Sequence, residues 1–236
     1  MPGSFGTDQI LRVPLLPVLA AQGLSVRRNA RLLPEPTGPR EGRIGRGPRL
    51  RLLITGDSSA AGVGAGTQGQ ALSGHLIKRL GKHHSVEWKL EATTGHTTQD
   101  TIDCLQRMTG EFDAVVTALG VNDVTRAVTR RQFANRQTRL IRILSENLGA
   151  RRIVITAVPQ MNRFPALPQP LAWVLGRQAA RLDRGLQEVV STFPHVRHLK
   201  LELPDDPALA ASDGYHPSPR TYDLWADKAA RMLLQA

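Results

Sequence analysis

The chain has 236 residues, of which 41% are hydrophobic and 22% charged, and its formal net charge is +11 at pH 7. That length suits one α/β domain with a terminal extension, and the apolar share excludes a disordered chain. The single cysteine, Cys104, excludes an intramolecular disulfide framework, and its half-apolar, helix-like surroundings predict a buried, inert thiol. No apolar run approaches the ~20 residues that a membrane-spanning helix needs.

Positive charge is concentrated at the N-terminus, where residues 1–51 hold nine Arg against three acidic residues. Residues 10–23 favour a short amphipathic segment packed on the domain or on a membrane surface. A signal peptide is the less favoured interpretation, because residues 1–9 lack Lys and Arg and two prolines interrupt the apolar run. Residues 33–49 are rich in Pro, Gly and Arg and predict a linker or surface-hugging loop. We therefore predict a basic extension with its linker over residues 1–49 and a folded domain over 50–236.

From Leu50 onward, apolar runs typical of buried strands alternate with helical patterns. Strands are predicted over residues 51–55, 86–94, 113–120, 152–158 and 196–201, and helices over 75–81, 97–108, 130–149, 171–192 and 218–235. Continuously apolar strands separated by helices indicate a parallel sheet covered on both faces. Ligands in such folds bind beyond the carboxyl ends of the strands, so the residues just after each strand carry the functional information.

The first strand runs into a glycine-rich loop, "GDSSAAGVGAGTQG" (56–69), which has three interpretations. A Walker A phosphate loop is excluded because no glycine here is followed by Lys. A dinucleotide pattern, G-x-G-x-x-G, occurs at Gly64–Gly69, but Gly64 comes about nine residues after the strand ends, where the first glycine should form the turn. The third interpretation is a turn that exposes Ser58 for attack on a carbonyl.

Polar residues elsewhere in the chain favour the third interpretation. Ester hydrolysis requires an activated hydroxyl, a base, a group that orients the base, and donors for the oxyanion. His216 is a candidate base for Ser58, and Asp213, three residues earlier, can reach its imidazole if the segment turns once. The loop is not the nucleophile elbow of α/β-hydrolases, because it lacks the second glycine of G-x-S-x-G.

Four blocks, taken together, resemble the SGNH, or GDSL-type, hydrolase family. They are "GDSSAAGVG" (56–64), Gly95, "GVND" (120–123) and "DGYH" (213–216), in the order of that family. The resemblance implies a flavodoxin-like three-layer α/β/α sandwich with a central, mainly parallel sheet. It also implies that Ser58 is the nucleophile, with Asp213 and His216 in the other triad positions. The oxyanion hole would consist of the backbone N–H groups of Ser58 and Gly95 and the side-chain amide of Asn122.

The residues at 95 and 122 suit those roles chemically. Glycine at 95 lets a substrate approach the backbone amide, and the neutral amide of Asn122 donates hydrogen bonds without competing for the charge of His216. Asp57 and Asp123 are expected to be structural, and Ser59 could replace Ser58 only if the loop were shifted. His195 and His198 lack an accompanying acidic or Cys cluster, so no metal site is predicted, and no cofactor is expected.

The predicted substrate pocket consists of His96, Val121, Met161 and Phe164. The last two belong to residues 159–173, where Met, Phe, Leu and four prolines predict either a rigid acyl-binding wall or lid, or a loop packed on the domain. The apolar character of this segment slightly favours acyl chains over sugars.

The sequence thus predicts a metal-independent serine hydrolase that cleaves short- to medium-chain carboxylic esters through an acyl-enzyme on Ser58. Because the base must be unprotonated, activity should fall at acid pH. The alternatives are a carbohydrate O-acetylesterase of the same fold and a catalytically silent domain that binds anionic surfaces. Expected partners are a small-molecule ester and, weakly through the basic N-terminal segment, an anionic membrane; no specific nucleic acid is expected. The expected location is cytoplasmic or membrane-peripheral rather than secreted or periplasmic, and the oligomeric state is open.

Overall fold

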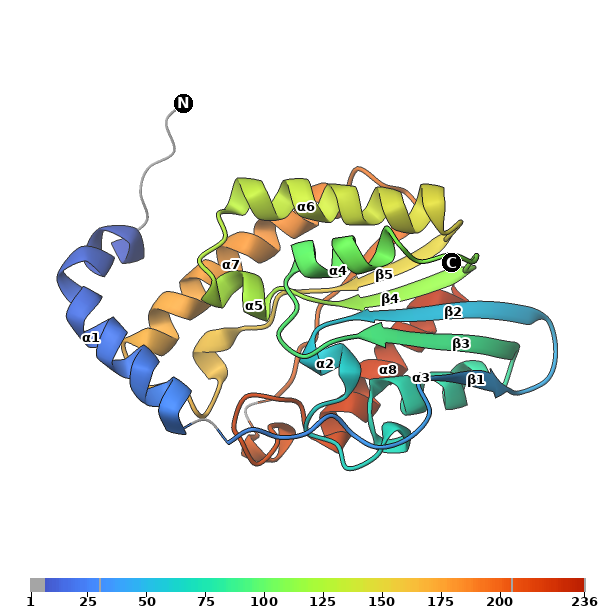
Figure 1. Ribbon diagram of the computed structural model, residues 1–236, viewed down its shortest axis with the longest axis horizontal. Coiled ribbons are helices and arrows are strands. Elements are labelled where there is room, and N and C mark those ends of the chain that lie inside the picture. The colour runs from blue at the N-terminus through green and yellow to red at the C-terminus, as the bar shows by residue number, and fades with distance from the viewer. Residues whose placement is uncertain (1–6, 30, 205, 236) are drawn as a thin grey trace.

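The computed structural model describes residues 7–29, 31–204 and 206–235. These residues form a six-stranded sheet in the order β1-β3-β2-β4-β5-β6 (Figure 1). Strands β2 to β6 are parallel, and β1 pairs antiparallel with β3 at one edge. The five parallel strands follow the flavodoxin-like order, which confirms the predicted fold. The strands are β1 (Glu41–Ile44), β2 (Arg49–Gly56), β3 (Ser85–Ala92), β4 (Ala114–Ala118), β5 (Arg152–Thr156) and β6 (Val196–Leu199).

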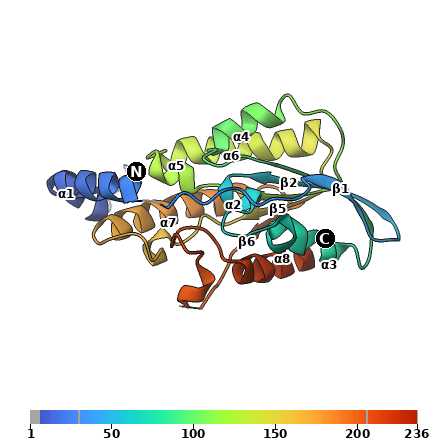
Figure 2. The same ribbon diagram turned by 60° about the horizontal axis from the view of Figure 1, so that its bottom comes forward.

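Helices cover both faces of this sheet and enclose two hydrophobic cores (Figure 2). On β2, Leu52 and Ile54 belong to one core and Leu53 to the other, so the strand is apolar on both faces. This is why the strand reads as a continuous apolar run in the sequence. Helices α3 (Leu72–Leu80) and α8 (Pro219–Leu234) pack on the first core, and α4 (Thr98–Leu105), α6 (Arg130–Arg142) and α7 (Leu171–Val190) on the second.

All five predicted strands and all five predicted helices are present, with shifted ends. The long helix predicted over 130–149 ends as α6 at Arg142 and continues as a π-helical turn, Ile143–Asn147. Two short helices were not predicted, namely α2 (Ser58–Ala61) after β2 and α5 (Val121–Thr125) after β4. They are too short to show a helical period in the sequence.

The N-terminal region differs from its prediction. Residues 33–49 were expected to lack regular structure, yet they contain β1, and Thr37 pairs with Thr67 in an isolated bridge. All four residues of β1 are exposed, and the strand is held by backbone pairing with β3. Its sequence therefore has no apolar pattern that would predict a strand. The folded domain therefore begins before Leu50.

The expected short segment at 10–23 is part of a longer helix, α1 (Thr7–Asn29), that contains Pro14 and Pro17. The first six residues of the predicted extension lie outside the described residues. No helix in the described part of the chain combines the length and apolarity needed to cross a membrane. On α4, Cys104 is half-buried rather than buried, because Thr101, Ile102 and Leu105 occupy the buried face of that helix.

Candidate active site

Ser58 is the first residue of α2, directly after the central strand β2. The buried side chain of Asp57 caps this helix by accepting a hydrogen bond of 2.9 Å from the backbone N–H of Ser59. The N–H of Ser58 belongs to the first helical turn and so has no partner inside the helix. Ser58 as a whole residue is half-buried.

Ser58, His216 and Asp213 form a hydrogen-bonded chain. The Nε2 atom of His216 lies 2.9 Å from Ser58 Oγ, and its Nδ1 atom lies 2.5 Å from Asp213 Oδ2. The other carboxylate oxygen of Asp213 accepts the backbone N–H groups of Tyr215 and His216 at 2.9 and 3.0 Å. The loop turns once between Asp213 and His216, as the three-residue spacing predicts.

The environment of Asp213 favours its ionised form. Burial raises the pKa of this carboxyl, but hydrogen bonds from the His216 side chain and from the two backbone N–H groups outweigh it and lower the pKa below its usual value. An ionised carboxylate only accepts hydrogen bonds, so Nδ1 of His216 must donate and carry the ring proton. The Nε2 lone pair then faces the Ser58 hydroxyl. A neutral imidazole with its proton on Nδ1 is the tautomer that a general base requires.

The two other predicted oxyanion donors follow the strands on either side of β2. Gly95 lies after β3 with a φ of +86°, a left-handed conformation that explains glycine at this position. Asn122 lies on α5 after β4, and its Nδ2 atom donates a hydrogen bond of 2.9 Å to the carbonyl of His96. This bond uses one N–H of the amide and holds the side chain next to the Gly95 loop, and the amide has a second N–H that can donate.

The sequence did not predict the role of Glu35 and Arg40. Glu35 accepts hydrogen bonds from the backbone N–H and the hydroxyl of Thr94, at 3.1 and 2.7 Å. Arg40 pairs with Glu35 at 2.7 Å and also donates to the carbonyl of Ala92. Burial raises the pKa of Glu35, but the bonds with Thr94 and Arg40 outweigh it and lower the pKa. The segment expected to be a linker thus holds the turn that carries Gly95.

Gly64, the first glycine of the dinucleotide pattern, lies against the catalytic loop, residues 213–217, which is named for the predicted roles of Asp213 and His216. A Cβ atom at this position would lie 2.3 Å from the carbonyl oxygen of Pro217 and 3.3 Å from Cβ of His216. Its φ is +101°. The glycine therefore lets the loop that carries His216 approach α2, which accounts for it without a bound nucleotide.

Asp123 is buried and structural, as predicted. One carboxylate oxygen accepts the backbone N–H and the hydroxyl of Thr98, both at 2.9 Å, at the start of α4. Arg136 lies 3.6 Å from the other oxygen. Burial raises the pKa of Asp123.

The predicted pocket residues do not all line a surface. Met161 is buried in the core on the α7 side of the sheet, because it begins a tight 3₁₀ turn (Met161–Arg163) that directs it inward. Val121 and Phe164 are half-buried and pack against the same core. His96 is half-buried beside Gly95 and contributes its carbonyl to Asn122.

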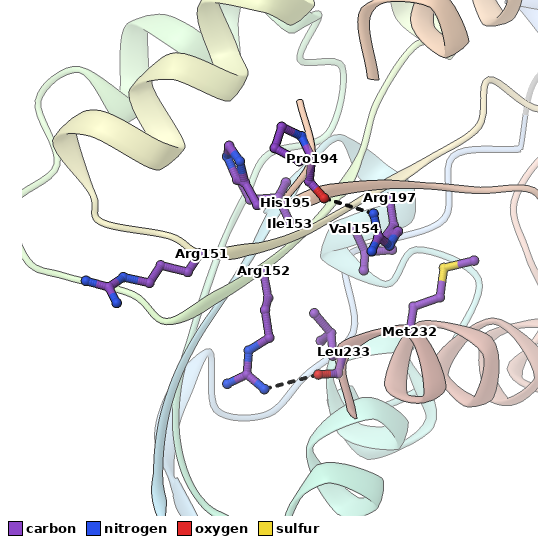
Figure 3. Close-up of a pocket in the computed structure, with 9 residues that line it drawn as sticks. All are labelled: Arg151, Arg152, Ile153, Val154, Pro194, His195, Arg197, Met232 and Leu233. Carbon is purple, nitrogen blue, oxygen red and sulfur yellow. Dashed lines mark hydrogen bonds between the residues drawn. The ribbon is translucent and has the colours of Figure 1, made fainter. Parts of the chain in front are cut away.

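A cavity of about 240 Å³ lies elsewhere, near the amino ends of β5 and β6 (Figure 3). Its nine lining residues include Arg151, Arg152 and Arg197 but no member of the triad. The guanidinium groups of Arg152 and Arg197 donate to the carbonyls of Leu233 and Pro194, which are structural contacts. Across residues 7–29, 31–204 and 206–235, no group of three or more His, Cys, Asp or Glu is arranged to hold a metal ion.

Solved structures of similar fold include a lipase/acylhydrolase from Enterococcus faecalis, with 23% identity and a TM-score of 0.58 over 77% of this chain and 94% of that chain. A member of the lipolytic protein G-D-S-L family from Veillonella parvula has 15% identity and a TM-score of 0.59, over 79% and 99%. The psychrotrophic esterase EstA from Pseudoalteromonas sp., in a structure inhibited by monoethylphosphonate, has 17% identity and a TM-score of 0.58, over 79% and 99%. No curated protein sequence matches the chain.

A flavodoxin-like sandwich with Ser, His and Asp joined at the carboxyl ends of its strands has the architecture of the SGNH hydrolases. Residues 54–224 match the model of the GDSL-like lipase/acylhydrolase family, and the chain belongs to that family.

Proposed function

We propose that the protein hydrolyses carboxylic esters through an acyl-enzyme on Ser58. The observation that carries this proposal is the continuous hydrogen-bonded chain from Ser58 Oγ through His216 to Asp213. Membership of the lipase/acylhydrolase family supports the same chemistry.

In the first half of the reaction, Nε2 of His216 removes the Ser58 proton while Oγ attacks the ester carbonyl. The developing oxyanion accepts hydrogen bonds from the N–H groups of Ser58 and Gly95 and from the amide of Asn122. Asp213 stabilises the imidazolium that forms without taking its proton. His216 then protonates the leaving alcohol, and the acyl group stays on Ser58.

In the second half, water enters at the position that the alcohol has left. His216 removes a proton from the water, the resulting hydroxide attacks the acyl carbonyl, and the same three donors stabilise the second oxyanion. Collapse of this intermediate returns the proton to Ser58 Oγ and releases the carboxylic acid. The cycle uses no group beyond the residues named and water.

We further propose short- to medium-chain acyl esters as the substrate class. Support comes from the loop 159–170, whose half-buried Phe164 and Leu167 pack against the core beside the site. The backbone N–H of Ala166 in this loop donates to the carbonyl of Gly214, and the hydroxyl of Tyr215 donates to the carbonyl of Ala166. An apolar loop that contacts the catalytic loop is suited to hold an acyl chain next to Ser58.

Hydrolysis of p-nitrophenyl acetate and butyrate by the wild type, Ser58→Ala and Ser59→Ala tests the nucleophile. We expect Ser58→Ala to lose about 10⁴-fold or more of the turnover, whereas Ser59→Ala stays within a few-fold of the wild type. Absence of turnover in the wild type, or equal turnover in the wild type and Ser58→Ala, would contradict the proposal.

A series of p-nitrophenyl esters of increasing acyl length tests the substrate class. The proposal predicts that kcat/KM is maintained or rises from acetate to longer acyl chains. A strict preference for acetyl would instead support a carbohydrate O-acetylesterase.

A further inference from the structure

Helix α1 is apolar around most of its circumference, but the domain covers only one side of it. The half-buried residues Leu15, Leu19, Gln22 and Val26 share one face at about 100° per residue. Away from this face, Val13 and Leu24 on the far side are 70% and 56% exposed, and Leu16 on the flank is 57% exposed. Helices of soluble domains normally expose a polar face, so this second apolar face requires an occupant.

Hydrogen bonds fix α1 to the loop beside the active site. The side-chain amide of Gln22 donates to the carbonyl of Gln169 at 2.6 Å and accepts the N–H of Leu171 at 3.1 Å. Figure 1 shows α1 along the start of α7, beyond the carboxyl ends of the strands. A surface bound to the exposed face of α1 would therefore lie at the end of the molecule where Ser58 is located.

The loop that holds α1 also touches the catalytic loop. Ala166, three residues before Gln169, forms hydrogen bonds with Gly214 and Tyr215. These two residues directly follow Asp213 in the chain. Only a few residues thus separate α1 from the triad. The orientation of α1 relative to Ser58 is set by this short connection.

Beyond Asp8 in its first turn, α1 carries only positive charge. Between Gln9 and Pro34 the sequence contains four arginines and no acidic residue. Arg27 and Arg28 are exposed in the last turn of α1, close to Leu24. Exposed leucines next to arginines, with no acidic side chain between them, complement an anionic phospholipid surface. A second copy of this chain would meet the same positive charge, which disfavours a dimer through this face.

We propose that α1 docks the protein on anionic phospholipid membranes, with Val13, Leu16 and Leu24 in the interface and Arg27 and Arg28 at the headgroups. Docking places the triad next to acyl esters in or near the membrane. That second statement depends on the proposed ester hydrolysis, whereas the docking itself does not.

Flotation of the full chain with phosphatidylcholine vesicles, with and without phosphatidylglycerol, tests the docking. We expect the wild type to float with the anionic vesicles and to dissociate as salt is raised. Leu16→Ser/Leu24→Ser should reduce the partition coefficient at least about tenfold, since it removes two side chains from the interface. The matched control, Leu224→Ser/Leu234→Ser on α8, changes leucines that are 39% and 38% exposed and should bind as the wild type does.

Charge and oligomerisation are tested with the same assay. Arg27→Gln/Arg28→Gln should weaken binding to anionic vesicles several-fold, whereas Arg131→Gln/Arg139→Gln, exposed on α6, should not. The docking proposal fails if the wild type does not bind anionic vesicles, or if both leucine variants lose binding equally. It also fails if the wild type does not bind vesicles and light scattering shows that it is a dimer, which the Leu16→Ser/Leu24→Ser substitutions dissociate.

Turnover of the soluble ester p-nitrophenyl acetate separates docking from catalysis. Leu16→Ser/Leu24→Ser should hydrolyse it at the wild-type rate, which also shows that the variant is folded. A wild type that binds vesicles but does not hydrolyse soluble esters would sink the proposed function and leave the docking intact.

Discussion

Two carboxyl groups near Ser58 have opposite pKa shifts. Burial raises the pKa of Asp213, but its hydrogen bonds outweigh burial and lower the pKa, so it remains ionised as the partner of His216. Burial raises the pKa of Asp57 to about 7, and the hydrogen bonds from Ser59 and from the backbone N–H of Ala60 do not compensate. Asp57 precedes Ser58 and caps α2, whereas Asp213 contacts the imidazole of His216, so only Asp213 is suited to orient that ring.

The raised pKa of Asp57 predicts a pH-dependent cost to stability. Between about pH 4 and pH 7 the folded state holds a proton that the unfolded state has released, so the free energy of unfolding falls as pH rises. From about pH 5 to pH 8 this contribution is about 3 kcal/mol. Asp57→Asn keeps an oxygen for the Ser59 N–H and should lack that decrease.

Urea unfolding of the wild type and of Asp57→Asn at about pH 5 and about pH 8 measures how much the free energy of unfolding of each protein changes with pH. The wild type should lose more stability than the variant on going from the lower to the higher pH. Parallel pH dependences in the two proteins would show that Asp57 titrates normally.

Asn122 is predicted to act in the transition state. Asn122→Ala removes one oxyanion donor and should lower kcat about 10²–10³-fold with little change in KM. Thr125→Ala on the same short helix serves as the control and should remain within a few-fold of the wild type. Steady-state kinetics on p-nitrophenyl butyrate measure both, and wild-type kcat in Asn122→Ala would remove Asn122 from the oxyanion hole.

At the scale of elements, the segment from Glu35 to Arg40 supports the turn that carries Gly95. Glu35→Gln weakens the pairing with Arg40 and the acceptor for Thr94, so the N–H of Gly95 should be less well positioned. We expect kcat to fall about tenfold, less than for loss of a donor, with KM nearly unchanged. Glu41→Gln, exposed on β1, is the matched control, and equal kinetics in the two variants would assign the Glu35 contact to stability alone.

The glycine loop is predicted to act through its packing on the catalytic loop. Gly64→Ala would push a Cβ against the carbonyl of Pro217 and should both reduce kcat and destabilise the fold by about 1–3 kcal/mol. Gly69→Ala, whose Cβ would lie 3.7 Å from its nearest neighbour, should be tolerated. Thermal unfolding and turnover measure both effects; similar behaviour of the two variants would contradict this role.

Local patterns in the sequence were sufficient to predict the buried strands of the sheet. Strands such as β2 and β4 are buried on both faces, so their apolar runs predicted a parallel sheet, and the residues that follow them included Ser58 and Asn122. Asp213 and His216 follow no predicted strand, and the family resemblance supplied their roles. β1 is exposed and is held by backbone bonds, which leave no side-chain pattern. The contacts of Glu35 with Thr94 and of Asn122 with the His96 carbonyl join residues distant in sequence, so no local pattern could reveal them.

At the scale of the whole molecule, every part of the proposed site lies at the carboxyl ends of the parallel strands. β3, β2 and β4 are neighbours, so Gly95, Ser58 and Asn122 follow three adjacent parallel strands. The loop before α8 adds Asp213 and His216 there. The N-terminal region adds Glu35 and α1 at the same end of the sheet. Helix α1 and the segment from Glu35 to Arg40 therefore lie beside the proposed site, whereas β1 extends the sheet at its edge.

The central claim is that Ser58 is the nucleophile that His216 activates. Intact-protein and peptide mass spectrometry after treatment with a serine-reactive phosphonate tests it most directly. We predict one adduct per chain, on the peptide that contains Ser58, with no adduct in Ser58→Ala and much slower labelling in His216→Ala. An unlabelled wild type, or a phosphonate on Ser59 or any other residue, would contradict it.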